Sequence, residues 1–267
     1  MQILKKSFLL LLLTACGNPE NTPVSTPQNI QTGEYITRKQ DEFRFIPLAA
    51  HSQPPPAYPW TSKDPNAITK YHFRCKGCLC NPPLILDKNG QKHRIYDCEG
   101  DMQHSLPVRD GKEFVYPILI DILNYIQNRA QQPVIITSGH RCPEHNAYVD
   151  PSPKNYSSKH IMGAEVSFYV QNYERQPQKI IEWIRDYYTS HPSKSADKDF
   201  TAFQISDKSD LRTKPLSNKE IFIKTYLSYE GRNKDNTHNF PYLSIQVRWD
   251  ESKNTRVTYT PQPLYRN

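Results

Sequence analysis

The sequence predicts an α+β fold, a single domain in which an antiparallel sheet is flanked by helices. Two amphipathic segments have the apolar spacing of helices, and three strand-like segments follow one another near the C-terminal end. Runs of strands interrupted by helices are typical of α+β proteins with an antiparallel sheet. Segment 67–260 is about 190 residues long, within the usual range for one domain, so we assign it to a single folded unit.

The first half of this domain predicts two helices and two strands. Segment 113–130 repeats apolar residues at helical spacing, and segment 143–149 can begin a helix because proline is tolerated in a first turn. Segments 133–137 and 164–170 are short apolar runs of the kind that form buried strands. The apolar positions of the first helix are Phe114, Ile118, Leu119, Ile122, Leu123 and Ile126.

The second half predicts one more helix and three strands. The strands cover 220–229, 242–249 and 256–260. The helix covers 177–189, and its apolar side consists of Ile180, Ile181, Ile184 and Tyr188.

The N-terminal end has the parts of a lipoprotein export signal. Lys5 and Lys6 supply positive charge, and residues 8–13 form an apolar run too short for a membrane span of about 20 residues. Leu13-Thr14-Ala15-Cys16 then matches the lipobox of bacterial lipoproteins. We predict that residues 1–15 are a signal peptide and that Cys16 becomes the lipidated N-terminus, since several acyl chains anchor a protein stably.

Residues 16–66 predict a lipidated tether between the membrane and the domain. The segment is rich in Pro, Thr, Asn and Gln, and it cannot bury enough apolar surface to offset its ordering entropy. Residues 261–267 form a C-terminal tail. The expected location is the cell envelope, on the periplasmic face. In a Gram-negative cell we expect the outer membrane, because Gly17 follows the lipidated cysteine.

The charge of the chain is mildly basic. Removing Lys5 and Lys6 with the signal lowers the formal net charge from +7 to +5. Acidic and basic residues are interspersed, so we expect no nucleic-acid partner. Approach to an anionic cell-wall polymer is compatible with this charge.

The cysteines beyond the lipidation site are Cys75, Cys78, Cys80, Cys98 and Cys142. In an exported protein such cysteines form disulfides, which predicts two bridges and one remaining thiol, with a connectivity that spacing does not settle. The alternative is a structural zinc ion held by the first four of them, because four thiolates satisfy tetrahedral coordination. The sequence leaves both interpretations open.

Two neighbouring motifs carry most of the functional information. The first reads TSGHRCPEHN at 137–146, and the second reads SKHIMG at 158–163. Both resemble the active-site region of the M15 peptidases, the zinc D-alanyl-D-alanine carboxypeptidases and L-alanyl-D-glutamate endopeptidases that trim peptidoglycan. The resemblance extends over about 71–249 and implies a fold of the M15 or hedgehog-like type.

The resemblance assigns roles to four residues of these motifs. In the family, the arginine of the first motif helps to hold the substrate carboxylate, and Arg141 occupies its position beside Ser138. The histidine of the second motif is the family's first zinc ligand, here His160, and the serine that shapes the pocket is Ser158. The implied ligand-binding set is therefore Ser138, Arg141, Ser158 and His160.

The remaining family positions lack the residues that zinc catalysis needs. The second ligand, an aspartate seven residues after the histidine, is Ser167, and Glu165 is the one nearby substitute. The third ligand, a histidine in a late strand, is Ser244, and the catalytic acid is Pro241. We therefore expect no catalytic residue and no zinc in this site. A displaced zinc site remains possible and would use His140, His160 and His238.

These observations predict a lipid-anchored, non-catalytic M15-like domain that binds peptidoglycan peptides or another envelope protein. The first alternative is an active zinc carboxypeptidase or endopeptidase that acts on peptidoglycan with a displaced ligand set. The second alternative is a structural envelope protein that is crosslinked through its cysteines.

Overall fold

The structure is a computed structural model that describes residues 66–100, 106–110, 112–150, 158–207, 209, 211–231 and 233–257. The predicted signal peptide, the lipidation site at Cys16, the tether up to residue 65 and the C-terminal tail lie outside the described residues. None of the described helices is long and apolar enough to cross a lipid bilayer.

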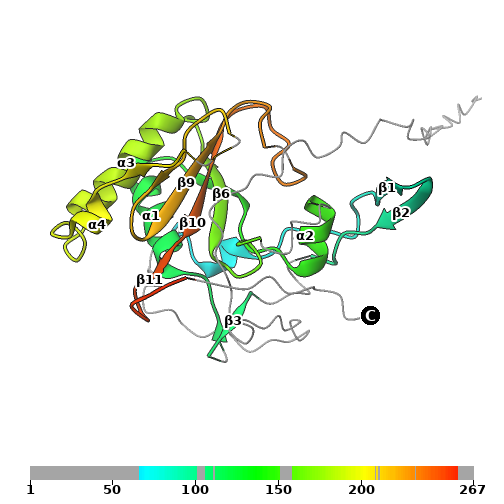
Figure 1. The fold of residues 1–267 in the computed structure, drawn as a ribbon, viewed down its shortest axis with the longest axis horizontal. Coiled ribbons are helices and arrows are strands. Elements are labelled where there is room, and N and C mark those ends of the chain that lie inside the picture. Colours follow the sequence, from blue (N-terminus) through cyan, green and yellow to red (C-terminus); the bar gives the residue numbers. More distant parts are fainter. Residues whose placement is uncertain are drawn as a thin grey trace, which may run out of the picture.

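A six-stranded antiparallel sheet forms the centre of the domain (Figure 1). Its order is β5-β6-β10-β9-β8-β7, so the strand that leads into the first motif pairs with the strand that follows the second motif, and the late strands extend the sheet from there. The strands are β5 (Val134–Ser138), β6 (Glu165–Val170), β7 (Gln204–Ile205), β8 (Leu216–Ser217), β9 (Ile221–Tyr226) and β10 (Tyr242–Val247).

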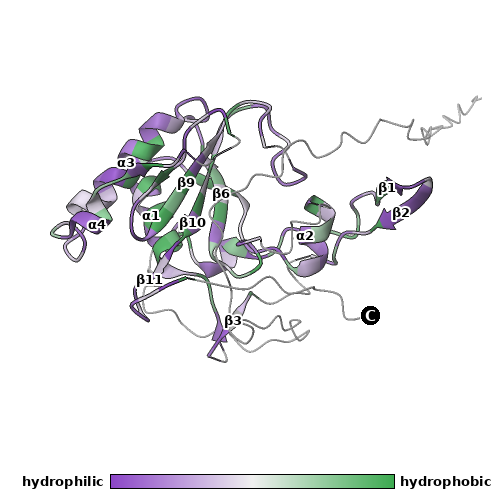
Figure 2. Cartoon of the chain, in the orientation of Figure 1, coloured by the Kyte–Doolittle hydropathy of each residue, from purple (hydrophilic) through white to green (hydrophobic). Residues whose placement is uncertain are grey.

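Two long helices cover one face of this sheet, namely α1 (Pro117–Ala130) and α3 (Pro177–Ser190) (Figure 1). Successive side chains of a strand point to opposite faces, and alternate residues of β6, β9 and β10 pack with these helices in the main core. The apolar colouring of helices and strands marks this layer in Figure 2. The core residues from the three strands are Val166, Phe168, Val170, Ile221, Ile223, Leu243, Ile245 and Val247.

The short helix α2 (Pro143–Val149) lies on the other side of the sheet from α1 and α3, and a two-stranded hairpin extends beyond it (Figure 1). The hairpin consists of β1 (Leu84–Lys88) and β2 (Gln91–Ile95), joined at Asn89 and Gly90, which both have positive φ. An Asn-Gly pair with this geometry is the preferred two-residue hairpin turn. The remaining elements are η1 (Lys70–Phe73), β3 (Val108–Arg109), β4 (Lys112–Glu113), α4 (Lys198–Thr201), β11 (Trp249–Asp250) and β12 (Thr255–Arg256).

The predicted fold class, a single α+β domain with an antiparallel sheet and flanking helices, is confirmed. The bounds of α2 agree with the prediction, but α1 begins at Pro117 and not at residue 113. Proline lacks the N–H that an interior helical position must donate, and it therefore begins helices readily. The predicted strand 242–249 is divided at Arg248 into β10 and β11. Of the predicted strand 256–260, the structure shows Arg256 in β12. Residues 258–260 lie outside the described residues.

Candidate functional site

A row of polar residues crosses four adjacent strands of the sheet. Ser138 of β5 pairs with Ser167 of β6, Ser167 pairs with Ser244 of β10, and Ser244 pairs with Lys224 of β9. The strand neighbours of Ser167, Ser244 and Lys224 pack into the core with α1 and α3, so these three side chains point to the opposite face. A register shift between Ile136 and Ser138 brings Ser138 into line with Ser167. All four residues are buried. The structure therefore places the two predicted ligand positions, Ser167 and Ser244, directly opposite each other.

The carboxylate of Glu165 is the centre of this polar face. One of its oxygens, Oε1, accepts hydrogen bonds from Ser244 Oγ at 2.5 Å and from Gln246 Nε2 at 2.9 Å. The same oxygen lies 3.1 Å from the ammonium nitrogen of Lys224. Burial alone would raise the pKa of Glu165, but the positive charge of Lys224 lowers that pKa well below its ordinary value. Glu165 is therefore ionised and paired with a buried cation.

His160 lies at the edge of this cluster. Its Nδ1 is 2.7 Å from the carbonyl oxygen of Gly139, and its Nε2 is 3.8 Å from Glu165 Oε1. Burial and the nearby charge of Arg141 lower the pKa of His160 to about 3, so the imidazole is neutral near pH 7. The half-buried Ser158 begins the turn that carries His160, and its carbonyl accepts the N–H of Ile161 at 3.2 Å.

The glycine of the first motif has a steric role. A Cβ atom at Gly139 would lie 2.5 Å from Cα of Phe73, because the end of β5 passes directly against η1. His140 N donates to the carbonyl oxygen of Phe73 at 2.6 Å at the same contact. Only glycine permits such an approach of two backbones, and this approach positions the loop that carries Arg141.

Arg141 is held by groups of the protein itself. Its Nε donates to Ser138 Oγ at 2.8 Å and to Asp235 Oδ2 at 2.9 Å. Asp235 comes from the β9–β10 loop, and its other oxygen lies 2.9 Å from Nε2 of His145. The position that the family resemblance assigns to a substrate carboxylate thus has an internal carboxylate beside it.

The charged chain continues from Asp235 through His145 to Asp97. Nδ1 of His145 lies 2.7 Å from Asp97 Oδ1, and the side chains of all four members from Arg141 to Asp97 are buried. Burial would lower the pKa of His145, but its bond to Asp235 and the charge of Asp235 raise that pKa to about 9. Arg141 and His145 hold the pKa of Asp235 below its ordinary value against the effect of burial. The chain therefore alternates negative and positive groups.

The residues present do not fit the zinc ion of the M15 peptidases. Of the family's three ligands, the polar face offers one imidazole, His160, and two hydroxyl groups. The possible substitute Glu165 is fully engaged by Lys224, Ser244 and Gln246. A zinc ion bound at His160 and Glu165 would lie beside the Lys224 ammonium, and two cations in a buried site repel each other strongly.

The structure does not assemble the displaced ligand set of three histidines. His140 Nδ1 lies 3.1 Å from the carbonyl oxygen of His160, and His238 Nδ1 lies 3.1 Å from that of Phe240. Among the described residues, one group of three or more side chains could hold a metal ion. It consists of Cys75, Cys98 and His145 and includes none of these three histidines. The alternative of a displaced zinc site at His140, His160 and His238 is therefore not supported by the described residues. Pro241, at the position of the family's acid, directly precedes β10.

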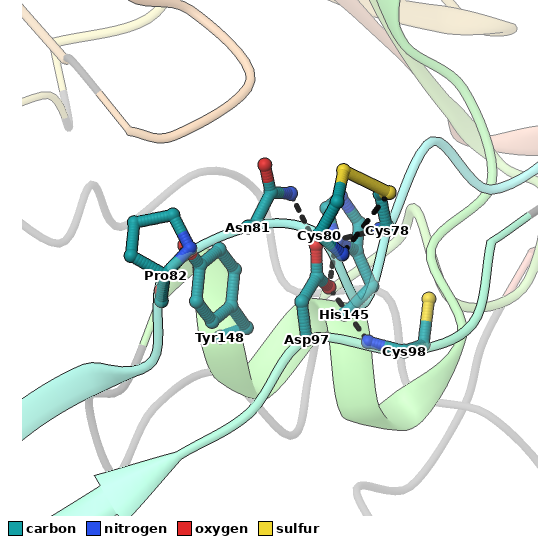
Figure 3. The surroundings of a disulfide bond; sticks show 8 residues. All are labelled: Cys78, Cys80, Asn81, Pro82, Asp97, Cys98, His145 and Tyr148. Carbon is teal, nitrogen blue, oxygen red and sulfur yellow. Dashed lines mark hydrogen bonds and ion pairs between the residues drawn. A yellow bond between two sulfur atoms is a disulfide. The ribbon is translucent and has the colours of Figure 1, made fainter. Parts of the chain in front are cut away.

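The cysteines differ from the prediction of two bridges. Cys78 and Cys80 form a disulfide, while Cys75, Cys98 and Cys142 are free and buried. The prediction was wrong because the three remaining sulfurs gather without a bond. Zinc coordination by Cys78 and Cys80 is excluded in this structure, since both are in the bridge. Figure 3 shows Asp97 between this bridge, Cys98 and His145.

Three residues of the site were not predicted: Lys224, Asp235 and Asp97. Lys224 lies in a segment predicted as a strand, but the face of a residue follows from the strand order, which the sequence does not state. Asp97 directly precedes Cys98, and it accepts the backbone N–H of Cys78 at 2.8 Å and the amide of Asn81 at 2.7 Å. An aspartate beside a cysteine in a cysteine-rich segment is the signal that could have drawn attention to it.

Comparison with known proteins supports the resemblance seen in the motifs. Residues 98–201 match the family described as Peptidase M15. This range includes Ser138, Arg141, His160 and Ser167, and it ends before β9 and β10. No curated protein and no solved structure matches the chain. Together with the α+β fold and the arrangement of the two motifs, the match shows that the chain contains an M15 peptidase-like domain.

Proposed function

We propose that the protein is a lipid-anchored cell-envelope protein whose M15 peptidase-like domain recognises peptides without cleaving them. The observation that carries this proposal is the buried ion pair between Glu165 and Lys224, at 3.1 Å. It lies among Ser167, Ser244 and His160, the positions from which the family binds zinc. An ammonium group supplies positive charge there, but it has no open coordination position for water.

Loss of the metal ligands removes the means of hydrolysis. A zinc hydrolase needs about three protein ligands, a coordinated water and a nearby acid–base group. A serine hydroxyl at Ser167 or Ser244 is neutral and is a poor substitute for carboxylate or imidazole. His160 is neutral, and its Nδ1–H donates to the backbone carbonyl oxygen of Gly139, so the ring is already oriented by the protein. The side chain of Pro241 cannot transfer a proton.

The proposed ligand is a peptide with a free carboxylate, such as a peptidoglycan stem peptide. Arg141 supports this choice, because a planar guanidinium binds carboxylates in a bidentate manner. Its Nη2 is buried and has no hydrogen-bond partner among the described residues. Asp235 already occupies the Nε side of the same guanidinium. Peptide binding would therefore exchange the Asp235 carboxylate for that of the ligand, with a rearrangement of the β9–β10 loop.

Substitutions of Arg141 and of its partner Asp235 should have opposite effects on peptide affinity. Arg141→Ala should weaken binding of a muropeptide by about 1.5–3 kcal/mol, the range for hydrogen bonds to charged groups. Arg141→Lys should also weaken it, because an ammonium group lacks the planar fork. Asp235→Asn should strengthen binding by removing the internal competitor while keeping its shape. Isothermal titration of the full-length chain with a muropeptide measures all three.

The matched control is Asp207→Asn, because Asp207 is an exposed carboxylate that pairs with Lys214 at the surface. It should leave the affinity unchanged. Equal affinity of wild type, Arg141→Ala and Asp235→Asn would exclude this carboxylate site as the place of recognition.

An envelope protein is the second candidate ligand, favoured by the hairpin of β1 and β2. The hairpin projects from the domain (Figure 1), and large apolar side chains are exposed on it and next to it. They are Leu79, Ile85 and Tyr96. Exposed apolar side chains that lie together are typical of protein contact sites. If the muropeptide does not bind, this hairpin is the surface on which a partner should be sought.

Crosslinking through cysteines has less support. The free thiols of Cys75, Cys98 and Cys142 are buried, and Cys78 and Cys80 are paired with each other. In the described part of the chain, no thiol is therefore exposed for a bond to another protein.

In the proposed anchor, Cys16 is the residue that carries the lipid. Cys16→Ser should prevent lipidation, so that the variant loses acyl labelling and appears as an unprocessed or soluble exported form. Membrane fractionation with labelled fatty acid measures this. Equal membrane retention and equal labelling of wild type and variant would show that the chain is not a lipoprotein.

A further inference from the structure

The three free thiols form a buried cluster that also contains His145. Cys75 follows η1, Cys98 follows β2, and Cys142 is the residue directly before α2. His145 lies in the first turn of α2, where its backbone N–H donates to Cys142 Sγ at 3.3 Å. Four side chains from three separate segments thus meet at one point, away from the polar face around Glu165.

The spacing of these groups matches a metal site. The sulfur atoms of Cys75 and Cys98 are 3.7 Å apart. Two thiolates on a tetrahedral zinc ion, each at about 2.3 Å from the metal, are separated by roughly 3.8 Å, whereas disulfide sulfurs are about 2.05 Å apart. The ligand atoms of Cys75, Cys98 and His145 all lie within 4.8 Å of one another. Cys142 packs with Cys75 and Cys98 in the same buried cluster, and its sulfur accepts the backbone N–H of His145, so it offers a fourth donor beside these three.

A glycine keeps the space between these ligands open. A Cβ atom at Gly77 would lie 2.0 Å from the sulfur of Cys98 and 3.1 Å from Nδ1 of His145. Any side chain at this position would enter the centre of the cluster. The same distances place Nδ1 of His145 on the side of the ring nearest Gly77, beside Asp97 Oδ1 at 2.7 Å.

Asp235 holds one nitrogen of His145, as a carboxylate usually does for a metal-bound imidazole. Metal-bound histidines usually hold their second nitrogen on a carboxylate, which fixes the ring. If Nδ1 binds the metal, it gives up its contact with Asp97, while Nε2 retains its bond to Asp235 at 2.9 Å. The disulfide keeps Cys78 and Cys80 out of the ligand set, which leaves three thiolates and one imidazole.

We propose that Cys75, Cys98, Cys142 and His145 bind one zinc ion in a structural site. Binding displaces the three thiol protons and the Nδ1 proton of His145 to solvent, and the closed set of four donors leaves no position for substrate. The ion would tie the segments before β1 and after β2 to the start of α2. Through His145 and Asp235 it would also hold the β9–β10 loop beside Arg141.

The test is the metal content and thiol state of the full-length chain, purified without chelator. We expect one zinc per chain. In the native chain the three thiols should react with an alkylating reagent only when a chelator is present, and after denaturation with chelator all three should react. Replacement of zinc by cobalt should give the absorption of a tetrahedral ion with thiolate-to-metal charge transfer. Absence of zinc from the wild type, or a single reactive thiol because two of the three are oxidised to a disulfide, would overturn the proposal.

Variants locate the ligands. Cys98→Ser and Cys142→Ser should each weaken zinc binding at least a hundredfold, measured by competition with a chromogenic chelator. The paired substitution Cys78→Ser with Cys80→Ser is the matched control for cysteine loss, and it should retain one zinc. His160→Ala should also retain it. Loss of zinc in either control would contradict the proposal. If a ligand variant does not fold, the thiol count and cobalt spectrum of the wild type decide alone.

Discussion

Replacing Lys224 by methionine is expected to lower the free energy of unfolding by about 3–5 kcal/mol, the range for removing one partner of a buried ion pair. Lys224 and Glu165 are both less than one-tenth exposed. Methionine has nearly the length of lysine, so packing is largely kept, while Glu165 loses the buried ammonium group that lies 3.1 Å from it. Urea unfolding followed by circular dichroism measures the effect.

Two further variants separate the ion pair from simple packing. In Glu165→Gln with Lys224→Met, no charge is left without a partner, so the double variant should be clearly more stable than Lys224→Met. Lys179→Met removes the exposed pair with Glu182 and should cost less than about 1 kcal/mol. A cost below about 1 kcal/mol for Lys224→Met would show that the pair does not hold this part of the sheet.

Restoring the family ligands should create a zinc site only after Lys224 is also changed. Ser167→Asp and Ser244→His place an aspartate and a histidine on residues that pair directly across β6 and β10. Both point to the side on which His160 lies near Glu165. With Lys224→Met added, the triple variant should bind one zinc more than the wild type.

The comparison with the double variant tests the role of the ammonium. Like charges about 4 Å apart repel by roughly 4 kcal/mol in a partly buried setting. The variant that keeps Lys224 should therefore bind the additional zinc at least about a hundredfold more weakly. His160→Ala should remove the additional zinc from the triple variant. Equal affinity with and without Lys224, or no dependence on His160, would show that the polar face does not correspond to the family's metal site.

The local structure was largely predictable because it depends on short-range patterns. Pro143 located α2 correctly, and the apolar runs located β5 and β6. The resemblance also aligned Ser167 with Ser244, and these residues face each other in the structure. The hairpin of β1 and β2 was missed, although Asn89-Gly90 is a strong turn signal. Its strands are mostly exposed and polar, so they lack the alternation that marks a half-buried strand.

The partners within the site depend on long-range contacts that the sequence does not state. Asp235 lies 94 positions after Arg141 in the chain, and it reaches the guanidinium because of where the β9–β10 loop folds. Lys224 meets Glu165 because β10 lies between β9 and β6. The two predicted disulfides rested only on the expected export of the protein. The actual arrangement of the cysteines depends on which segments meet around Gly77.

The most direct test of the central claim is the incubation of the full-length wild-type chain with zinc and a muropeptide that ends in D-Ala-D-Ala. Mass spectrometry of the peptide is the measurement, with His160→Ala as the parallel sample. We predict that both samples leave the muropeptide intact, because the polar face holds a Glu165–Lys224 ion pair in place of a metal. Zinc-dependent release of D-alanine, or cleavage within the peptide, by the wild type but not by His160→Ala would contradict the account.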